Sequence, residues 1–262
     1  MKIHRVWGMT LRYIYAFRHN IDKMADAFYW PTIDILLWGL TSTYLTASNP
    51  EGGPTAFFVV LSGILLWLIV WRGQGEITMN ALEEFWERNL INLFASPLMF
   101  REWMASLLAL GFVKAMMSFA FAVTLAWFLY AVNLFHLGFL LIPFGLLLIM
   151  TGWWFGFLVM GLILRFGRKV QALAWTSIFV ISPFSAAYYP LSTLPEWAQA
   201  IGKCIPITYV FEGSREVIAT GHIDPWKLII SFVLNIVYLT AAGWFLHRSF
   251  EKLRERGLEK IN

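Results

Sequence analysis

Two ionisable side chains, Asp34 and Lys114, stand inside long apolar stretches of the sequence. An uncompensated charge in hydrocarbon costs several kcal/mol, so each side chain needs a partner or water if these stretches cross a membrane. Both lie at a comparable depth if the two stretches run in the same direction, because a helix rises about 1.5 Å per residue. We therefore expect either that Asp34 and Lys114 form an ion pair or that one of them lines a conduit, and we favour the ion pair.

Residue patterns for catalysis or metal binding are absent from the sequence. The histidines are scattered near the ends of apolar stretches, and no cluster of His, Cys and Asp has the spacing of metal ligands. The single cysteine, Cys204, excludes an internal disulfide. No Gly-x-x-x-x-Gly-Lys-[Ser/Thr] motif occurs, so the chain should not bind ATP itself. We expect no catalytic, cofactor or metal site on this chain.

Aromatic side chains are the remaining candidates for ligand contact, and the chain has 14 Trp, 9 Tyr and 23 Phe. Their rings could stack on sugars or on flat apolar drugs. Many of them fall near the ends of apolar stretches, where aromatic residues gather at membrane interfaces. We favour lipid contact and core packing as the explanation for most of them.

The composition defines the class of protein that must position these residues. Of the 262 residues, 59% are apolar and only 14% are charged, and the mean hydropathy is +0.64. Soluble domains carry about 25% charged residues, so a soluble enzyme is excluded and a polytopic membrane protein is indicated. Six spans of about 20 residues leave no room for a separate soluble catalytic domain. Any energy-driven work needs a second chain.

The apolar stretches divide into six predicted spans, separated by polar or proline-rich segments. The spans are 25–45, 55–71, 102–133, 137–164, 170–189 and 225–247. Residues 1–23 place apolar side chains at helical spacing among basic ones, which is typical of an amphipathic helix in the membrane interface. The predicted fold is an all-α integral membrane protein with a single transmembrane domain over 1–262, in which 25–71 holds spans one and two and 102–189 holds spans three to five.

The basic residues predict the orientation of these spans. Of the 20 Lys and Arg residues, all except Lys114, Lys203, Arg215 and Lys227 fall in segments 1–23, 72–101, 165–169 and 248–262. The positive-inside rule then places both termini in the cytoplasm of a cell whose plasma (inner) membrane holds the protein. The net charge of +4 indicates contact with anionic membrane lipids and not nucleic-acid binding, because the cations are spread over four segments.

The segment 72–101 is amphipathic, with one apolar stripe at helical spacing. The polar residues that face away from this stripe are Asn80, Glu83, Glu84, Glu87 and Arg88. Ser96-Pro97 ends the helix, and Arg101-Glu102 opens the third span. Two interpretations stay open at this point. The segment is either an interfacial connecting helix or a docking helix, over about 76–97, that receives force from a cytoplasmic partner through its acidic face.

The segment 190–224 holds a second group of candidate residues, on the external side. Ser192-Thr193 before Pro195 predicts one helix start, and Pro206 predicts another, because proline suits the first turn of a helix. We expect two short re-entrant helices that dip back toward the bilayer, and an ordinary structured loop is the alternative.

Three short motifs in this external segment resemble those of the permease subunits of type-2 ABC exporters. They are Pro-Leu-Ser-x-Leu-Pro-x-Trp from Pro190 to Trp197, Pro-x-Thr-Tyr from Pro206 to Tyr209, and Glu-Gly-x-Arg from Glu212 to Arg215. The resemblance extends over nearly the whole chain, including the basic N-terminal helix, the six spans and the cytoplasmic helix. The Glu-x-Gly-Thr sequence that often starts the cytoplasmic helix in that family is replaced here by Leu82-Glu83-Glu84-Phe85.

The resemblance implies partners and roles for the candidate residues. It implies a homodimer or close heterodimer of permeases, with two cytoplasmic ATPase subunits that hold ATP and Mg²⁺. It assigns ATPase coupling to Glu83, Glu84, Glu87, Arg88, Arg101 and Glu102. It assigns an external gate to Pro190, Pro195, Pro206, Tyr209, Glu212, Arg215 and Glu216.

The predicted function is the permease subunit of an ATP-driven exporter. ATP-driven closure of the partner would push on the 76–97 helix and open a path formed chiefly by the second and fifth spans of both copies. Drugs, lipids and lipid-linked glycans or polysaccharides stay open as amphiphilic substrates. The alternative is an intramembrane enzyme, a secondary transporter or a scaffold without an ATPase. Paired intramembrane catalytic residues and a convincing internal repeat, which would favour an enzyme or a secondary transporter, are not found.

Overall fold

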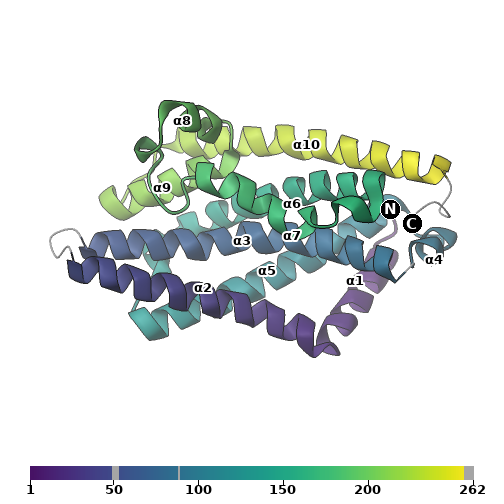
Figure 1. The fold of residues 1–262 in the computed structure, drawn as a ribbon, viewed down its shortest axis with the longest axis horizontal. Helices are drawn as coiled ribbons and strands as arrows, with labels where there is room; N and C mark the ends of the chain where they lie inside the picture. The colour runs from purple at the N-terminus through teal and green to yellow at the C-terminus, as the bar shows by residue number, and fades with distance from the viewer. Residues whose placement is uncertain (49–52, 88, 257–262) are drawn as a thin grey trace.

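The computed structural model describes residues 1–48, 53–87 and 89–256, and this part of the chain is helical, without strands. The longer helices are α1 (Ile3–Arg18), α2 (Ile21–Ser48), α3 (Gly53–Trp86), α5 (Phe100–Tyr130), α6 (Leu141–Phe166) and α10 (Pro225–Arg256). The shorter ones are α4 (Leu90–Ala95), α7 (Leu173–Ile181), α8 (Glu196–Lys203) and α9 (Pro206–Thr220), with 3-10 turns between several of them. The long helices lie roughly side by side as an elongated bundle (Figure 1).

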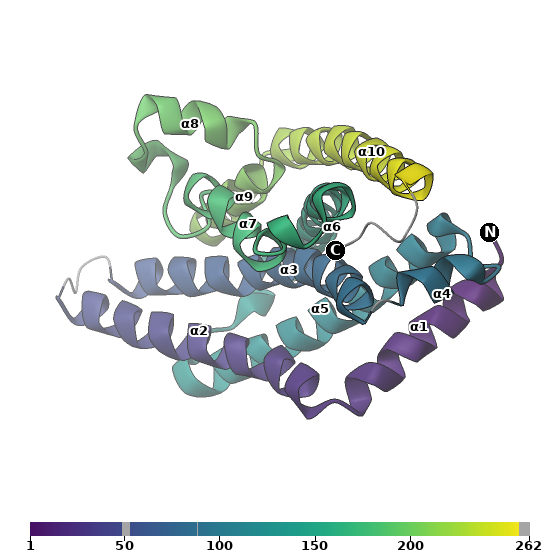
Figure 2. The same ribbon diagram turned by 45° about the vertical axis from the view of Figure 1, so that its right-hand side comes forward.

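Helix α3 is the centre of the bundle. It packs against α6, α5 and α2, and α10 covers the far side of α6. Figure 2 shows α2 and α10 on opposite faces, with α3 and α6 between them, while α5 crosses behind α2. Close approach of α3 and α6 depends on Gly152, since a Cβ there would stand 2.7 Å from the Val70 carbonyl oxygen. Small residues at such crossings let helix backbones pack tightly in a membrane.

Helix α2 runs through Pro31 without ending there. A proline inside a helix leaves the carbonyl four residues earlier without its hydrogen bond. That carbonyl belongs to Ala27, and it accepts a 2.9 Å hydrogen bond from the Ser118 hydroxyl of α5. The side chain of a neighbouring helix thus replaces the missing backbone donor, which is how membrane helices tolerate proline.

Four helical segments are long and apolar enough to cross a membrane: Ala56–Trp86, Phe100–Tyr130, Leu134–Phe166 and Pro225–Glu255. They correspond to the predicted second, third, fourth and sixth spans. The first predicted span lies in α2, which has the length but carries the charges Asp22, Lys23, Asp26 and Asp34. The fifth, 170–189, contains only the nine residues of α7 and a short 3-10 turn. The structure therefore supports four of the six spans by length and composition.

The segment 72–101 differs from its prediction as a separate helix over about 76–97. Helix α3 continues the second span without interruption to Trp86, and among the described residues of the segment the only separate helix before α5 is the six-residue α4. Two glycines, Gly73 and Gly75, stand between Trp71 and Trp86, where they could weaken a helix. Both lie inside α3, so the helix is not interrupted there. The predicted docking helix is therefore mostly the end of a membrane-length helix.

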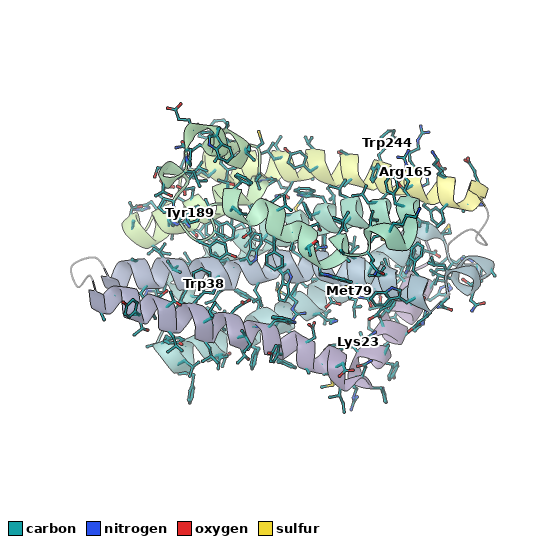
Figure 3. The ribbon with its side chains drawn as sticks, in the orientation of Figure 1. Lys23, Trp38, Met79, Arg165, Tyr189 and Trp244 are labelled. Atoms are coloured by element: carbon teal, nitrogen blue, oxygen red, sulfur yellow. The ribbon has the colours of Figure 1, made fainter. Side chains whose placement is uncertain are left out.

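The two ends of the bundle differ in what they contain. The N-terminus, the C-terminal end of α10 and α4 lie at one end, and α8 lies toward the other (Figure 1). We call the first the terminal end and the second the α8 end. Lys23 and Arg165 lie toward the terminal end and Tyr189 toward the α8 end (Figure 3). Two helices begin at the prolines that the sequence predicts. Helix α8 begins directly after Pro195, and α9 begins with Pro206 in its first turn.

Candidate functional site

A cavity of about 680 Å³ lies between α2, α3 and α7, with one residue of α5 at its wall. Its lining mixes charged, aromatic and small side chains. The residues are Asp22, Lys23, Asp26, Trp30, Asp34, Trp38, Ile64, Trp67, Trp71, Arg72, Gln74, Gly75, Glu76, Met79, Asn80, Glu83, Lys114, Ala174, Trp175, Thr176, Phe179 and Tyr188. The volume falls within the roughly 300–1,000 Å³ that is typical of small-molecule sites.

One face of α2 supplies the cavity with a regular stripe. Asp22, Asp26, Trp30, Asp34 and Trp38 recur at every fourth position and all line the cavity. Residues four apart share one face of a helix, so this stripe is a consequence of the sequence. Its place inside an apolar stretch of the sequence singles out only Asp34 among them. The alternation of acidic and aromatic residues at this spacing is the signal that could have found the rest.

A buried ion pair joins α3 to α5 at the cavity wall. The Lys114 Nζ lies 2.6 Å from Glu76 Oε2, and the two side chains are only 11% and 7% exposed. Asn80 donates to the same carboxylate oxygen over 3.2 Å, and the Lys114 ammonium also stands 4.7 Å from the centre of the Phe17 ring. The lysine is thus held by a carboxylate and an aromatic face together.

Two further pairs connect α2 to α3 along the same cavity. Arg72 Nη1 lies 2.6 Å from Asp26 Oδ2, and its second terminal nitrogen donates to the Asp26 main-chain oxygen. Lys23 Nζ lies 2.6 Å from Glu83 Oε2. These side chains, apart from Arg72, are partly exposed, and the two contacts join α2 to α3 at two points.

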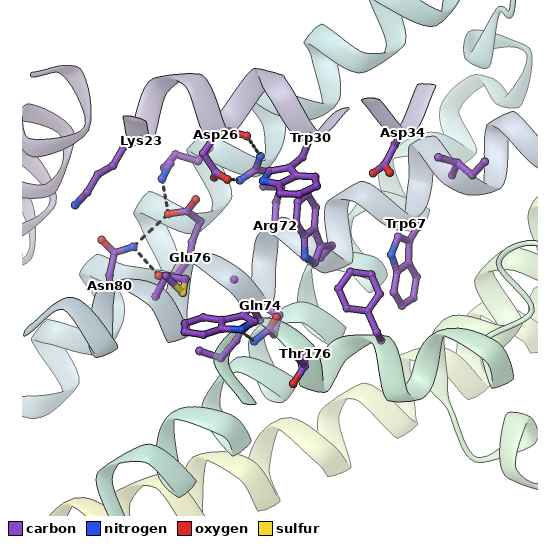
Figure 4. A pocket seen from close by; sticks show the side chains of 18 of the residues that line it. Lys23, Asp26, Trp30, Asp34, Trp67, Arg72, Gln74, Glu76, Asn80 and Thr176 are labelled. Carbon is purple, nitrogen blue, oxygen red and sulfur yellow. Dashed lines mark hydrogen bonds and ion pairs between the residues drawn. The ribbon is translucent and has the colours of Figure 1, made fainter. Parts of the chain in front are cut away.

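Asp34 and Lys114 both line this cavity, but they do not pair with each other. The favoured prediction of an Asp34–Lys114 pair is replaced by the Glu76–Lys114 pair. Figure 4 shows the Asp34 carboxylate directed into the space between Trp30 and Trp67. Among the residues that the structure describes, none forms an ion pair with Asp34. The expected common depth is also wrong. Ser118 and Phe121 of α5 contact Ala27 and Phe28 of α2, so Lys114 lies near the start of α2, about three helical turns before Asp34.

The aromatic lining contains five of the tryptophans, Trp30, Trp38, Trp67, Trp71 and Trp175. The Trp38 ring stacks on Tyr188, with ring centres 5.3 Å apart and an angle of 16° between the planes. Trp67 contacts the same tyrosine with a centre distance of 6.4 Å. Lipid contact and core packing, the explanation that we favour for most aromatic residues, does not describe these positions, where the rings form a cavity wall.

At the terminal end, Glu84 forms a buried polar centre that ties α1 to α3. It is 2% exposed, and it accepts hydrogen bonds from the Tyr13 hydroxyl at 2.9 Å and from Asn89 at 2.5 Å. Arg12 pairs with it at 3.1 Å, and Trp103 donates its indole N–H to the Tyr13 oxygen at 2.9 Å. Burial, with the Glu84 charge beside it, raises the pKa of the Tyr13 hydroxyl, so the tyrosine stays a neutral donor.

Glu102 is also buried, at the start of α5. Its carboxylate accepts the main-chain N–H of Lys2 at 2.6 Å and that of Met99 at 3.1 Å, and Arg5 lies 3.6 Å away. The bond to Met99 is the glutamate half of a capping box, which satisfies a free N–H at the helix start. Glu102 therefore fixes the N-terminus of the chain to α5, and its side chain is not free for an external partner.

The predicted coupling residues thus separate into two groups. Glu84 and Glu102 are buried, and Glu83 is half-buried in its pair with Lys23, which contradicts an acidic face that points away from the protein. Glu87 and Arg101 are exposed. Arg88 lies outside the described residues. The residues share a polar face as the helical spacing predicts, but Arg12 and Tyr13 of α1 contact Glu84, and Lys23 of α2 contacts Glu83.

The predicted gate residues lie between the end of α7 and the start of α10. Arg215 of α9 pairs with Glu212 at 3.1 Å and donates to the main-chain oxygens of Ala186 and Ala187. Glu212 in turn accepts the Leu191 N–H at 2.9 Å. The two side chains thereby hold the loop after α7, including Pro190, against α9.

The other gate candidates make local contacts that shape the same segment. The Tyr209 hydroxyl donates to the Lys203 carbonyl at 2.8 Å, which fixes the end of α8 to α9. Glu216 pairs with Lys227 at 2.8 Å and accepts the Asp224 N–H at 3.2 Å. The Lys227 ammonium, with this backbone donor, holds the pKa of Glu216 below its ordinary value.

Within the described residues, no group of three or more His, Cys, Asp or Glu side chains has a geometry for a metal ion. A model of the ABC-2 type transporter family matches residues 17–219. The match covers α2 to α9 and therefore every helix around the cavity. No curated protein matches the chain.

Proposed function

From the premise that the chain belongs to the ABC-2 type transporter family, we propose that it forms the translocation path of an ATP-driven exporter for amphiphilic substrates. Membership makes the chain a transport permease subunit of the membrane. The proposal of an amphiphilic substrate depends on the cavity between α2, α3 and α7. Charged and aromatic side chains both line this cavity.

The proposed topology has six crossings, with both termini in the cytoplasm. Helix α2 is long enough for one crossing, since 28 residues extend about 42 Å. Several of the charges that lower its hydropathy face the cavity and not lipid, which is where intramembrane charges are tolerated. Helix α7, with the chain that follows it to Tyr189, supplies the fifth and partly non-helical crossing, where α3 covers its backbone.

A second copy of the chain is the partner that we propose for the face formed by α2 and α7. The path then lies between two copies, each contributing its own cavity. The ATP and Mg²⁺ sites belong to two separate ATPase subunits at the terminal end. We propose the plasma (inner) membrane as the location, with anionic lipids around the basic α1.

The proposed ATPase contact is the exposed junction of α3, α4 and α5. It presents Glu87, the Ser96-Pro97 turn, Met99 and Arg101, all of which are exposed. A push on α4 reaches α3 and α5 directly, because α4 lies between the end of one and the start of the other. The Glu84 and Glu102 contacts then carry the displacement to α1.

Opening on the outer side is proposed to release the Glu212–Arg215 contact with the loop after α7. Arg215 holds that loop through two main-chain oxygens, so a small rotation of α9 breaks several hydrogen bonds together. In this proposal the loop after α7, together with α8 and α9, is the gate. The residues that shape it are Pro190, Pro195, Pro206, Tyr209 and Glu216.

Co-expression with a candidate ABC ATPase, followed by reconstitution, tests the proposal. We expect the chain to retain the ATPase through purification and to change its rate of hydrolysis. Reversing both exposed charges, in a Glu87→Lys and Arg101→Glu variant, should reduce retention of the ATPase by about tenfold, because reversed charges repel across an interface.

The matched control is Glu196→Lys, which reverses one exposed charge on α8 at the opposite end. It should retain the ATPase as the wild-type chain does. A chain that neither retains nor stimulates any ABC ATPase would contradict the proposed function. Equal losses in the control and in the test variant would contradict the proposed contact surface alone.

A further inference from the structure

The charges that line the cavity do not balance. Five acidic residues and three basic ones contribute to its wall. Each basic residue is already engaged: Lys23 by Glu83, Arg72 by Asp26 and Lys114 by Glu76, each at 2.6 Å. The two acids that remain are Asp22, which is exposed, and Asp34, which is half-buried.

Asp34 is the carboxylate placed to meet a ligand. It lies between Trp30 and Trp38, one helical turn away on each side along the same face of α2. Its carboxylate points into the cavity, toward Trp67 of the facing helix α3 (Figure 4). Half-burial among aromatic rings makes an unpaired carboxylate costly, and a cationic ligand would remove that cost.

Aromatic faces favour the same sign of ligand charge. The face of an indole ring is negative and attracts a cation within about 6 Å of its centre. The structure already uses this contact for its own cations, with Arg72 4.7 Å from the Trp71 ring. Gln74 Oε1 and Arg72 Nε are also buried without a hydrogen-bond partner. Gln74 Oε1 is an acceptor and Arg72 Nε is a donor, so together they do not change the preference of the cavity for a cationic ligand.

We propose that this cavity binds an amphiphilic organic cation, whose charge lies beside Asp34 and whose apolar body lies against the surrounding tryptophans. The inference rests on the proposed function, because it names the class of substrate that the exporter carries. An amphiphilic anion meets the opposite conditions, since the cations of the cavity are engaged and the free group is a carboxylate.

Two ions of the same shape and opposite charge provide the test. Tetraphenylphosphonium and tetraphenylborate are titrated into the purified chain in nanodiscs, and binding to protein-free nanodiscs is subtracted. We expect the phosphonium to bind at least about tenfold more tightly than the borate. Equal binding of the two ions, or absence of phosphonium binding, overturns the proposal.

Asp34→Asn removes the charge and keeps the shape of the side chain. We expect it to weaken phosphonium binding by about tenfold and to leave the Tm unchanged or higher, because an unpaired carboxylate is lost. Glu196→Gln makes the same change in net charge on α8 and should bind phosphonium as the wild-type chain does. Wild-type affinity in the Asp34→Asn variant overturns the proposal.

Trp30→Leu separates the aromatic contribution from the ionic one. Trp30 is 46% exposed, so its replacement should not disturb the fold. We expect about a threefold loss of phosphonium affinity, and no loss in Trp197→Leu, which removes an exposed tryptophan from α8. A loss of the same size in both variants overturns the aromatic part of the proposal.

Failure here is distinguishable from failure of the proposed function. Binding to the isolated chain needs no ATPase, so a chain that couples to an ATPase but ignores phosphonium refutes the substrate class alone. A chain that binds phosphonium through Asp34 but couples to no ATPase refutes the exporter and keeps the binding site.

Discussion

Two helix contacts inside the bundle hold buried polar groups in different ways. Between α6 and α10 the group is neutral: Asn235 is fully buried and accepts from the Thr151 hydroxyl at 2.8 Å and the Trp154 indole at 3.2 Å. Its amide nitrogen donates to the main-chain oxygens of Leu147 and Ser231. All four hydrogen-bonding positions of one side chain are therefore used.

Around the cavity the polar groups are charged instead. The contacts of α3 with α2 and α5 contain Lys23–Glu83, Arg72–Asp26 and Lys114–Glu76. A neutral amide already suffices to join two helices, and charges cost more to bury. The α6–α10 contact thus depends on neutral hydrogen bonds, while the contacts beside the cavity depend on ion pairs.

The largest effect should come from breaking the buried pair between α3 and α5. Lys114→Met leaves Glu76 buried without its cation, and we expect a loss of about 3–5 kcal/mol in the free energy of unfolding. Unfolding in detergent, followed by tryptophan fluorescence, measures the loss. The double variant Lys114→Met with Glu76→Gln should be milder than the single one.

Lys114→Met with Asp34→Asn is the control for that experiment, because the two residues do not pair. Its effect should equal the sum of the two single effects. A double-variant effect that departs from this sum would show that Asp34 and Lys114 interact after all, and would remove the basis for an unpaired Asp34.

The second effect concerns the charged centre at the terminal end. Tyr13→Phe removes the hydroxyl that joins Glu84 to Trp103, and we expect a loss of about 2 kcal/mol, typical of a hydrogen bond to a charged group. The same variant should lower substrate-stimulated ATP hydrolysis in the reconstituted complex. Tyr15→Phe removes an exposed hydroxyl from the same helix and should leave both quantities unchanged.

The neutral network should be weaker than either charged site. Asn235→Leu leaves the Thr151 hydroxyl and the Trp154 N–H without this acceptor, and we expect a loss of about 1 kcal/mol. Adding Thr151→Val should recover part of it, since removing both partners is less costly than removing one. A loss as large as that of Lys114→Met would refute the contrast between the two contacts.

The smallest effect should come from Glu216 and Lys227 at the α8 end. Lys227 lowers the pKa of Glu216 in the folded chain. The ionised Glu216 therefore contributes its full stabilisation of the fold above the unfolded-state pKa of about 4.3, and this contribution is lost as the pH falls through the lower folded-state pKa. The Tm of the wild-type chain should fall more than that of Glu216→Gln below about pH 4. Parallel curves would contradict this assignment.

The sequence determined those features that depend on composition and local geometry. The apolar fraction and the clustered cations gave a helical membrane protein, the motifs from Pro190 to Arg215 pointed to its family, and Pro195 and Pro206 marked two helix starts. Proline at a helix start acts through its own fixed backbone angle, so no distant residue is needed to predict it.

The tertiary structure decided which side chains meet. Helical spacing put Glu84 on a polar face, but only the packing of α1 showed that this face is covered by Arg12 and Tyr13. Counting residues into the two spans predicted one level for Asp34 and Lys114, but the packing of α5 against α2 places Lys114 about three turns from Asp34 and beside Glu76 of α3. Periodicity fixes which residues share a face of a helix, and it contains no information on the helix that this face meets. The pairing of charges, and with it the unpaired Asp34, follows from the packing of α2, α3 and α5.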